Sequence, residues 1–252
     1  ETARCLSLAE PDLLSVSVEQ MDNEVARALS RSRARDDLQI VVESGIDASV
    51  ASELARYQGG CLWITWQGND QPDKETARAL ASVAGVLRLD IEEIDQEVAK
   101  ALATHTGDLD LASLENLDAG TAQELGKAQC SRLILDGLSS LDAVVAKELA
   151  KYGSEERQWT SIAIPEKPEE FVKNALAVRS GKRYPGPQLV HPERGVAHIL
   201  RNPRNLCLNG VVNLDATVAG ILAHAAADIL ELGQLNRRSK KIWDAARAEK
   251  EQ

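Results

Sequence analysis

The chain has 252 residues, 44% of them hydrophobic and 27% charged, which places it among globular proteins and excludes a disordered chain. No apolar run approaches the roughly 18 residues of a membrane span. Aromatic residues make up only 3%, so Leu, Ile, Val and Ala must form the core, a composition suited to many small, similar layers. The net charge of −10, with no aromatic residues between the basic ones, argues against a nucleic-acid partner.

One pattern repeats along most of the chain. Its anchor is a leucine that recurs at intervals of 22 to 27 residues, at Leu29, Leu54, Leu80, Leu102, Leu125, Leu149, Leu176, Leu200 and Leu222. An alanine three residues earlier accompanies nearly every anchor, at Ala26, Ala51, Ala77, Ala99, Ala122, Ala146, Ala197 and Ala219. A period of this length is typical of proteins built from stacked structural repeats.

Each unit has two halves with different periodicities. The first half, such as LDLASL at 109–114 or LILDGL at 133–138, alternates apolar and other residues and predicts a strand of about six residues. The second half, such as DAVVAKELAKYG at 142–153, has apolar residues at helical spacing and begins with an Asp suited to N-capping. It predicts a helix of about ten residues that often ends near a Gly. Such a unit cannot bury its apolar face alone, so stacked neighbours must cover it.

The pattern LxLxxLxxLDAxxAxxLA resembles the repeats of the bacterial leucine-rich-repeat-like proteins, which read close to LxLxGLxxLxxxAAxxLAxxxG. The clearest copies are Leu109–Gln129, Leu133–Gly153 and Leu206–Ala223, and the resemblance covers about residues 13 to 235. It implies an α/β repeat solenoid of strand–helix units that is used for binding.

Two layers of buried side chains are expected in these copies. Inward strand residues should be fully buried at equivalent levels, at Leu111, Leu135 and Leu208. Aliphatic side chains should pack the turn after the strand, where ordinary leucine-rich repeats carry a ladder-forming Asn, at Leu114, Leu138 and Val211.

We expect a single solenoid over residues 1–252, with regular repeats over about 13–151, degenerate repeats over about 152–205, and a last repeat with a cap over 206–252. The third unit carries an insertion, QGNDQPD at 67–73, between its strand and its helix. In the degenerate region the eighth strand should be an irregular extended segment, because Pro185 and Pro187 cannot both donate to a central ladder. The polar C-terminal helix, RSKKIWDAARAEKEQ, suits a terminal cap, with Ile242 and Trp243 docking on the final unit.

Charge is unevenly distributed along the chain. Residues 1–150 hold 13 Lys and Arg against 27 Asp and Glu, a net charge of −14, whereas residues 151–252 hold 16 against 12, a net charge of +4. A candidate basic patch in the second part consists of Arg179, Lys182, Arg183, Arg194, Arg201 and Arg204. The patch indicates either a surface for an anionic partner or ordinary solvated loops and helix ends.

The strand residues between the inward leucines should face outward on the sheet side. Candidates for a binding surface there are Trp63, Thr65, Arg88, Asp90, Asp110, Asp136 and Asn209, and the same face should include Gln39, Ala112, Ile134 and Cys207. The stretch WITW places Trp63 and Trp66 on opposite faces. Trp63 is therefore either an aromatic binding anchor or a side chain covered by the insertion at 67–73.

The cysteines and histidines give no sign of a metal site. Cys5, Cys61, Cys130 and Cys207 lie far apart without a CxxC pair, so we expect four free thiols, which favours a cytoplasmic location. The chain begins without Met and without a leader-like segment. No common catalytic or nucleotide-binding motif occurs, and we expect neither a metal nor a cofactor.

These features favour a non-enzymatic protein-interaction module, either a scaffold or a subunit of a larger assembly, with a protein as partner. The alternative is an enzyme or ligand-binding protein whose site lies in the irregular segment 152–205, where loops and basic residues gather. A concave pocket around a buried His191 or Glu193 would favour that alternative. The sequence leaves open whether the chain forms homo-oligomers.

Overall fold

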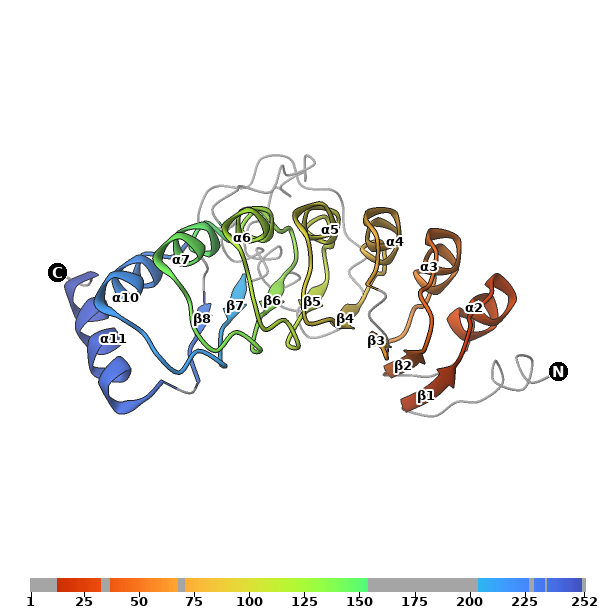
Figure 1. The fold of residues 1–252 in the computed structure, drawn as a ribbon, viewed down its shortest axis with the longest axis horizontal. Helices are drawn as coiled ribbons and strands as arrows, with labels where there is room; N and C mark the ends of the chain where they lie inside the picture. Colours follow the sequence, from red (N-terminus) through yellow and green to blue (C-terminus); the bar gives the residue numbers. More distant parts are fainter. Residues whose placement is uncertain are drawn as a thin grey trace, which may run out of the picture. The chain divides into compact units, whose positions relative to one another are not determined.

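The computed structural model describes residues 13–32, 37–67, 71–153, 204–226, 229–233 and 235–250. These residues all belong to one compact unit, formed by Glu1–Glu155 and Arg204–Gln252. Strands and helices alternate along it, and the strands form a single eight-stranded parallel sheet whose order follows the chain. The unit is therefore α/β with a repeating strand–helix arrangement, and helices α2 to α7 and α10 follow one another along one side of the strands (Figure 1).

The strands are β1 (Leu13–Val18), β2 (Asp37–Val42), β3 (Cys61–Trp66), β4 (Val86–Asp90), β5 (Asp108–Asp110), β6 (Arg132–Ile134), β7 (Asn205–Cys207) and β8 (Ile229–Glu231). The helices are α2 (Asn23–Ser30), α3 (Ala48–Leu54), α4 (Lys74–Leu80), α5 (Gln96–Leu102), α6 (Ala119–Leu125), α7 (Ala143–Leu149), α10 (Ala216–Ala223) and α11 (Arg237–Lys250). The predicted strand length of six is met only in β1 to β3 among the described strands, and helices α2 to α7 and α10 have 7 or 8 residues rather than ten.

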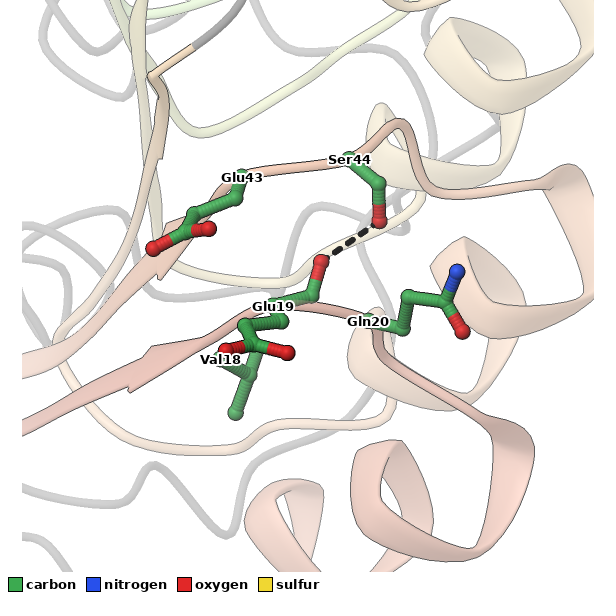
Figure 2. Close-up of a pocket in the computed structure, with 5 residues that line it drawn as sticks. All are labelled: Val18, Glu19, Gln20, Glu43 and Ser44. Atoms are coloured by element: carbon green, nitrogen blue, oxygen red, sulfur yellow. Dashed lines mark hydrogen bonds between the residues drawn. The ribbon is translucent and has the colours of Figure 1, made fainter.

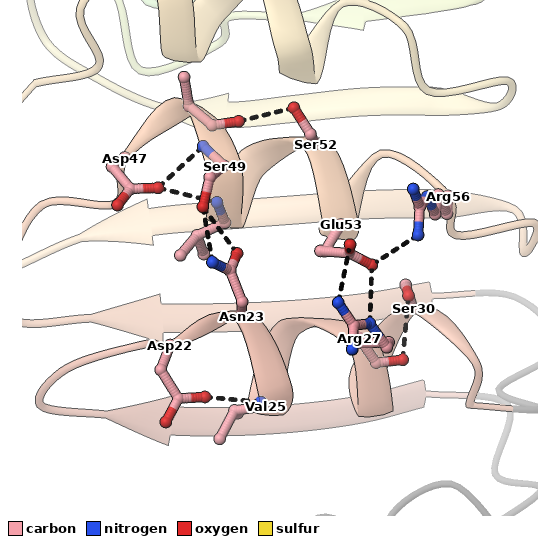
Figure 3. A network of polar contacts seen from close by, with 12 residues as sticks. Asp22, Asn23, Val25, Arg27, Ser30, Asp47, Ser49, Ser52, Glu53 and Arg56 are labelled. Atoms are coloured by element: carbon pink, nitrogen blue, oxygen red, sulfur yellow. Dashed lines mark hydrogen bonds and ion pairs between the residues drawn. The ribbon is translucent and has the colours of Figure 1, made fainter.

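Helices α2 to α7 and α10 each begin directly after an aspartate. The capping residues are Asp22, Asp47, Asp73, Asp95, Asp118, Asp142 and Asp215. Each carboxylate accepts a hydrogen bond from a backbone N–H group in the first turn, which would otherwise lack a partner. The predicted use of Asp as N-cap is confirmed, and Figure 3 shows two of these caps, at Asp22 and Asp47.

Adjacent helices are also linked by polar side chains, as Figure 3 shows for α2 and α3. Arg27 Nη2 lies 3.2 Å from Glu53 Oε1, and Arg56 Nη1 lies 2.8 Å from Glu53 Oε2. Ser49 Oγ donates to Asn23 Oδ1 at 2.9 Å. Because the two arginine side chains are largely exposed, these ion pairs contribute little to stability, and the buried core must hold the helices in place.

The core consists of equivalent layers, one from each unit. The anchor leucines in the described ranges are all at most 1% exposed, and so are the alanines three residues before them. Inward strand residues pair across the sheet in one register, as Leu38, Leu62, Leu87, Leu109, Leu133, Leu206 and Leu230. The predicted burial of Leu111, Leu135 and Leu208 is confirmed, since each is 0% exposed. The anchors Leu176 and Leu200, with Ala197, lie outside the described residues.

Two kinds of unit differ in how the chain leaves the strand. In the units of β1 to β4 the third inward residue follows the first by four positions, as Val42 follows Leu38, so the strand alternation continues. In the units of β5 to β7 it follows by five, as Leu114 follows Leu109. The extra residue is accommodated in a tight turn, closed by hydrogen bonds from Leu114 N to Leu111 O, Leu138 N to Leu135 O and Val211 N to Leu208 O at 3.0, 3.3 and 3.2 Å. The residues predicted to pack this turn are buried, at 0%, 1% and 0% exposure, respectively, for Leu114, Leu138 and Val211.

Glycine is required in these turns only where one turn stacks on another. A Cβ at Gly137 would lie 2.5 Å from Ala112 O, and a Cβ at Gly210 would lie 1.8 Å from Asp136 O. The equivalent position in the first turn of this kind is Ser113, which faces β4, a strand without such a turn. A side chain fits there because the preceding unit leaves room.

The sheet passes directly from β6 to β7. Leu133 pairs with Leu206, and helix α7 contacts α10. The degenerate repeats predicted over about 152–205 fall almost entirely outside the described residues, so they stay a prediction. The segment LCLNGV at 206–211 has the same inward leucines and the same turn glycine as LILDGL at 133–138, so it fits against β6 directly.

The C-terminal end contains one more strand than predicted. Strand β8 pairs with β7, so α11 is the helix of a terminal strand–helix unit. Ile242 and Trp243 of α11 are partly buried against the core, and Ser239 Oγ accepts from Leu214 N at 2.8 Å, which confirms the predicted docking of this helix. Among the helices of the described ranges, none combines the length and apolarity that crossing a bilayer requires.

Candidate functional site

The strands carry a row of outward side chains on the face of the sheet away from the helices. Register places Gln39, Trp63, Arg88, Asp110 and Ile134 in adjacent positions of successive strands. All of these side chains are half-buried, whereas the inward residues on either side of each are fully buried. The prediction that these residues share one face of the sheet is therefore confirmed.

Asp90 is the centre of a hydrogen-bonded group on this face. Its Oδ2 accepts from Trp63 Nε1 at 2.6 Å and from Thr65 Oγ1 at 2.8 Å. Its Oδ1 lies 3.3 Å from Ser113 Oγ and 3.4 Å from Arg88 Nε. One carboxylate thus ties together side chains from β3, β4 and the turn after β5.

Trp63 and Arg88 are stacked. The guanidinium carbon of Arg88 lies 4.0 Å from the centroid of the Trp63 ring, within the range of a cation–π contact. Arg88 Nε also lies 3.9 Å from Asp110 Oδ2, close enough for an ion pair but too far for a hydrogen bond. The side chains of Arg88, Asp90 and Asp110 keep 35%, 20% and 15% exposure, so the group is held in place and still reaches solvent.

We call this group the Trp63–Asp110 cluster and define it as Trp63, Thr65, Arg88, Asp90, Asp110 and Ser113. Sequence reasoning selected all of its members except Ser113. The signal that could have identified Ser113 is that later units carry Gly137 and Gly210 at the same place. The alternative that the insertion at 67–73 covers Trp63 involves residues outside those described.

Asp110 has an excess of negative charge around it. Burial raises the pKa of its carboxyl above the usual value, the Ala112 N–H group and Arg88 lower it, and neighbouring Asp90 and Asp136 raise it further. Its Oδ1 accepts from Ala112 N at 3.0 Å. On and directly after β4 to β6, the outward carboxylates of Asp90, Asp108, Asp110 and Asp136 outnumber the guanidiniums of Arg88 and Arg132.

The remaining predicted sheet-face residues play a structural part. Asp136 Oδ1 accepts from Asn209 N at 2.9 Å, and its Oδ2 lies 3.3 Å from Asn209 Nδ2, so the two residues join consecutive turns. Cys207 pairs with Ile134 in the outward row of the sheet, as expected, but it is covered there and is only 3% exposed. Asp136 and Asn209 are hydrogen-bonded to each other and lie outside the Trp63–Asp110 cluster.

One residue of the predicted basic patch, Arg204, is buried rather than exposed. Arg204 is 2% exposed, donates from Nη1 to Ala128 O at 3.2 Å, and places its guanidinium carbon 5.8 Å from the centroid of the Tyr152 ring. It cannot belong to an exposed patch, because it packs inside the unit between backbone and ring. Arg179, Lys182, Arg183, Arg194 and Arg201 lie outside the described residues, as do His191 and Glu193 of the alternative site.

The cysteines in the described ranges, Cys61, Cys130 and Cys207, are free, as predicted, while Cys5 lies outside those ranges. Burial raises the pKa of Cys61 to about 11, with Asp37 and Asp110 adding to the effect. Burial likewise raises the pKa of Cys130 to about 11 and that of Cys207 to about 12. These thiols stay protonated at neutral pH, so none is suited to nucleophilic chemistry.

Other polar features of the described part are structural or solvated. Figure 2 shows a surface hollow beside the ends of β1 and β2, where Ser44 Oγ donates to Glu19 O at 2.6 Å and the Glu19 and Glu43 side chains are exposed. His105 is fully buried, with Nδ1 3.0 Å from Ala81 O and Nε2 3.2 Å from Asp108 O. Within the described ranges no three His, Cys, Asp or Glu side chains are grouped so that they could hold a metal ion.

No family model matches the chain, and no curated protein gives a match.

Proposed function

We propose that this chain is a non-enzymatic protein-interaction module, a scaffold or assembly subunit, built as a leucine-rich-repeat-like solenoid. The observation that carries the proposal is the Trp63–Asp110 cluster on the face of the sheet away from the helices. Trp and Arg are the side chains that most often dominate binding energy at protein interfaces, and here they lie stacked in one place.

The cluster is ordered before any partner arrives. Asp90 fixes the indole N–H of Trp63 and approaches Arg88 Nε, so the rotamers of both side chains are restrained. A surface whose large side chains are already fixed loses less conformational entropy on binding. This preorganisation favours a binding role over a solvated polar surface, where such side chains would be mobile.

Site-directed photo-crosslinking tests the proposal. A benzophenone amino acid placed at Ile134 lies next to Asp110 in the sheet register, and one placed at Val144 lies on α7 of the same unit, where the native side chain is 56% exposed. We expect a protein from native extract to crosslink at position 134 and not at position 144. Crosslinking at 144 alone would move the interface to the helices and overturn the proposal.

The crosslinked partner then allows a kinetic test of the anchor. Trp63→Ala removes the ring on which Arg88 stacks, so we expect dissociation to become at least about tenfold faster with little change in association. Surface plasmon resonance with the captured partner measures both rates. An unchanged dissociation rate would show that Trp63 is not an anchor.

A further inference from the structure

The sheet face around the Trp63–Asp110 cluster is acidic. The carboxylates of Asp90, Asp110 and Asp136 lie on successive units, whose strands in a sheet are about 4.8 Å apart, and Arg88 is the cation that approaches them. Burial raises the pKa of the Asp110 carboxyl most, and the neighbouring carboxylates of Asp90 and Asp136 raise it further. A cation brought to this place would relieve that repulsion.

The cluster also has acceptor capacity left over. Asp90 Oδ2 already accepts hydrogen bonds from Trp63 and Thr65. Both carboxylate oxygens of Asp136 accept hydrogen bonds from Asn209. Asp110 uses Oδ1 for the Ala112 N–H group, while its Oδ2 has Arg88 Nε at 3.9 Å, beyond hydrogen-bond distance. The Oδ2 atom of Asp110 is therefore placed to accept a donor from a partner.

The following inference rests on the proposed function. We propose that the partner docks on this face through a basic segment, with a Lys or Arg side chain at Asp110 Oδ2 beside Arg88 and the Trp63 ring. Charge complementarity is the argument for this occupant, because the face carries more carboxylates than guanidiniums. The aromatic ring of Trp63 adds apolar contact for the aliphatic stem of such a side chain. An acidic segment would meet uncompensated carboxylates and is disfavoured.

Fluorescence anisotropy with labelled oligolysine and oligoglutamate peptides tests this chemistry on the full chain. Asp110→Asn removes one negative charge at the proposed contact and keeps an acceptor for Ala112 N. The matched control, Glu75→Gln, removes one negative charge from α4 on the helix side, where the native side chain is 62% exposed. A thermal melt of each variant confirms that it is folded.

We expect oligolysine to bind, oligoglutamate not to bind, and Asp110→Asn to weaken oligolysine binding roughly fivefold while Glu75→Gln leaves it unchanged. Equal weakening by both variants would show that only the overall negative charge attracts the peptide, and would overturn the proposal. Absence of oligolysine binding, with the crosslink at position 134 retained, would overturn the basic partner and leave the interaction surface standing. Concentration-dependent self-association that Asp110→Asn weakens, seen by analytical ultracentrifugation without oligolysine competition, would make a second copy the occupant instead.

Discussion

The units of β1 to β4 and those of β5 to β7 bury the same layers but leave the strand differently. In the first group the alternation of inward and outward residues continues for 5 or 6 residues, whereas in the second group the strand has 3 residues and a tight turn follows. A single additional residue between inward side chains separates the two forms. Strand length in this protein is thus set by the spacing of apolar residues after the strand has begun.

The boundary between the two groups is where the candidate site lies. Long strands contribute two outward side chains each, such as Trp63 with Thr65 and Arg88 with Asp90. The first short strand adds Asp110, and its turn adds Ser113, whose side chain fits because no earlier turn lies against it. The cluster therefore depends on a change of unit type that occurs once along the described sheet.

The largest expected effect is the loss of an inward side chain in either group. Leu135→Ala after β6 and Ile64→Ala in β3 each empty a fully buried position, so each should lower the free energy of unfolding by about 2–5 kcal/mol. Chemical denaturation measures both. A substantially smaller loss for Leu135→Ala would show that the short-strand units do not share the layer of the long-strand units.

The next largest effect on stability should come from the close stacking of one turn on another. Gly210→Ala brings a Cβ against Asp136 O and should destabilise the fold by about 1–3 kcal/mol. Gly220→Ala is the matched control, because no atom lies within 4 Å of its added Cβ and alanine suits a helix interior, so it should stabilise by about 0.5–1 kcal/mol. Equal thermal shifts for the two variants would contradict the close contact between the stacked turns at Gly210.

Several parts of this organisation could be predicted from the sequence, because each depends on a local signal. The Leu and Ala spacing defined the helices and their buried face, and the Asp before each helix defined its start. The direct pairing of β6 with β7 could not be predicted from spacing, because the interval between them contains anchor-like leucines at 176 and 200. Strand β8 was missed because its ILE run is too short to distinguish from a loop.

The contacts of the candidate site depended on information that periodicity does not contain. Outward faces follow from alternation, so Trp63, Arg88 and Asp110 could be assigned to one face. Their mutual bonds require the register between strands more than 20 residues apart and the rotamers of long side chains. The prediction that Arg204 belongs to an exposed patch was wrong for the same reason, since no local pattern shows that a basic side chain will pack against a tyrosine ring.

Helix capping gives a smaller effect that both groups of units should share. Asp118→Ala should cost about 1 kcal/mol, because the Thr121 N–H group loses its acceptor, whereas Asp118→Asn keeps the cap. That N–H group holds the pKa of Asp118 below its usual value, so the carboxylate stabilises the fold at neutral pH and this stabilisation is lost as the pH falls through the lowered folded pKa. Acid denaturation that proceeds identically in Asp118→Asn and the native chain would contradict the assignment.

The reactivity of the cysteines distinguishes the two groups of units, and it does so without a change in stability at neutral pH. Cys61 in the long-strand group is partly exposed with a pKa of about 11, whereas Cys207 in the short-strand group is buried with a pKa of about 12. Alkylation followed by mass spectrometry at pH 8 should modify Cys61 first, roughly a hundredfold more slowly than in the unfolded chain. Because both folded pKa values are raised, stability should decline as the pH rises from the unfolded thiol pKa toward these values. Faster modification of Cys207 than of Cys61 would contradict the expected order of burial.

The measurement that tests the central claim most directly records stability and oligolysine affinity for the same variant, Asp110→Asn. Burial and neighbouring carboxylates raise the pKa of Asp110, so its charge costs stability at neutral pH, and the variant should melt at the same temperature as the native chain or higher. Its affinity for oligolysine should nevertheless fall. A lower melting temperature with unchanged affinity would show that Asp110 serves the fold alone and that a basic segment does not dock at its carboxylate.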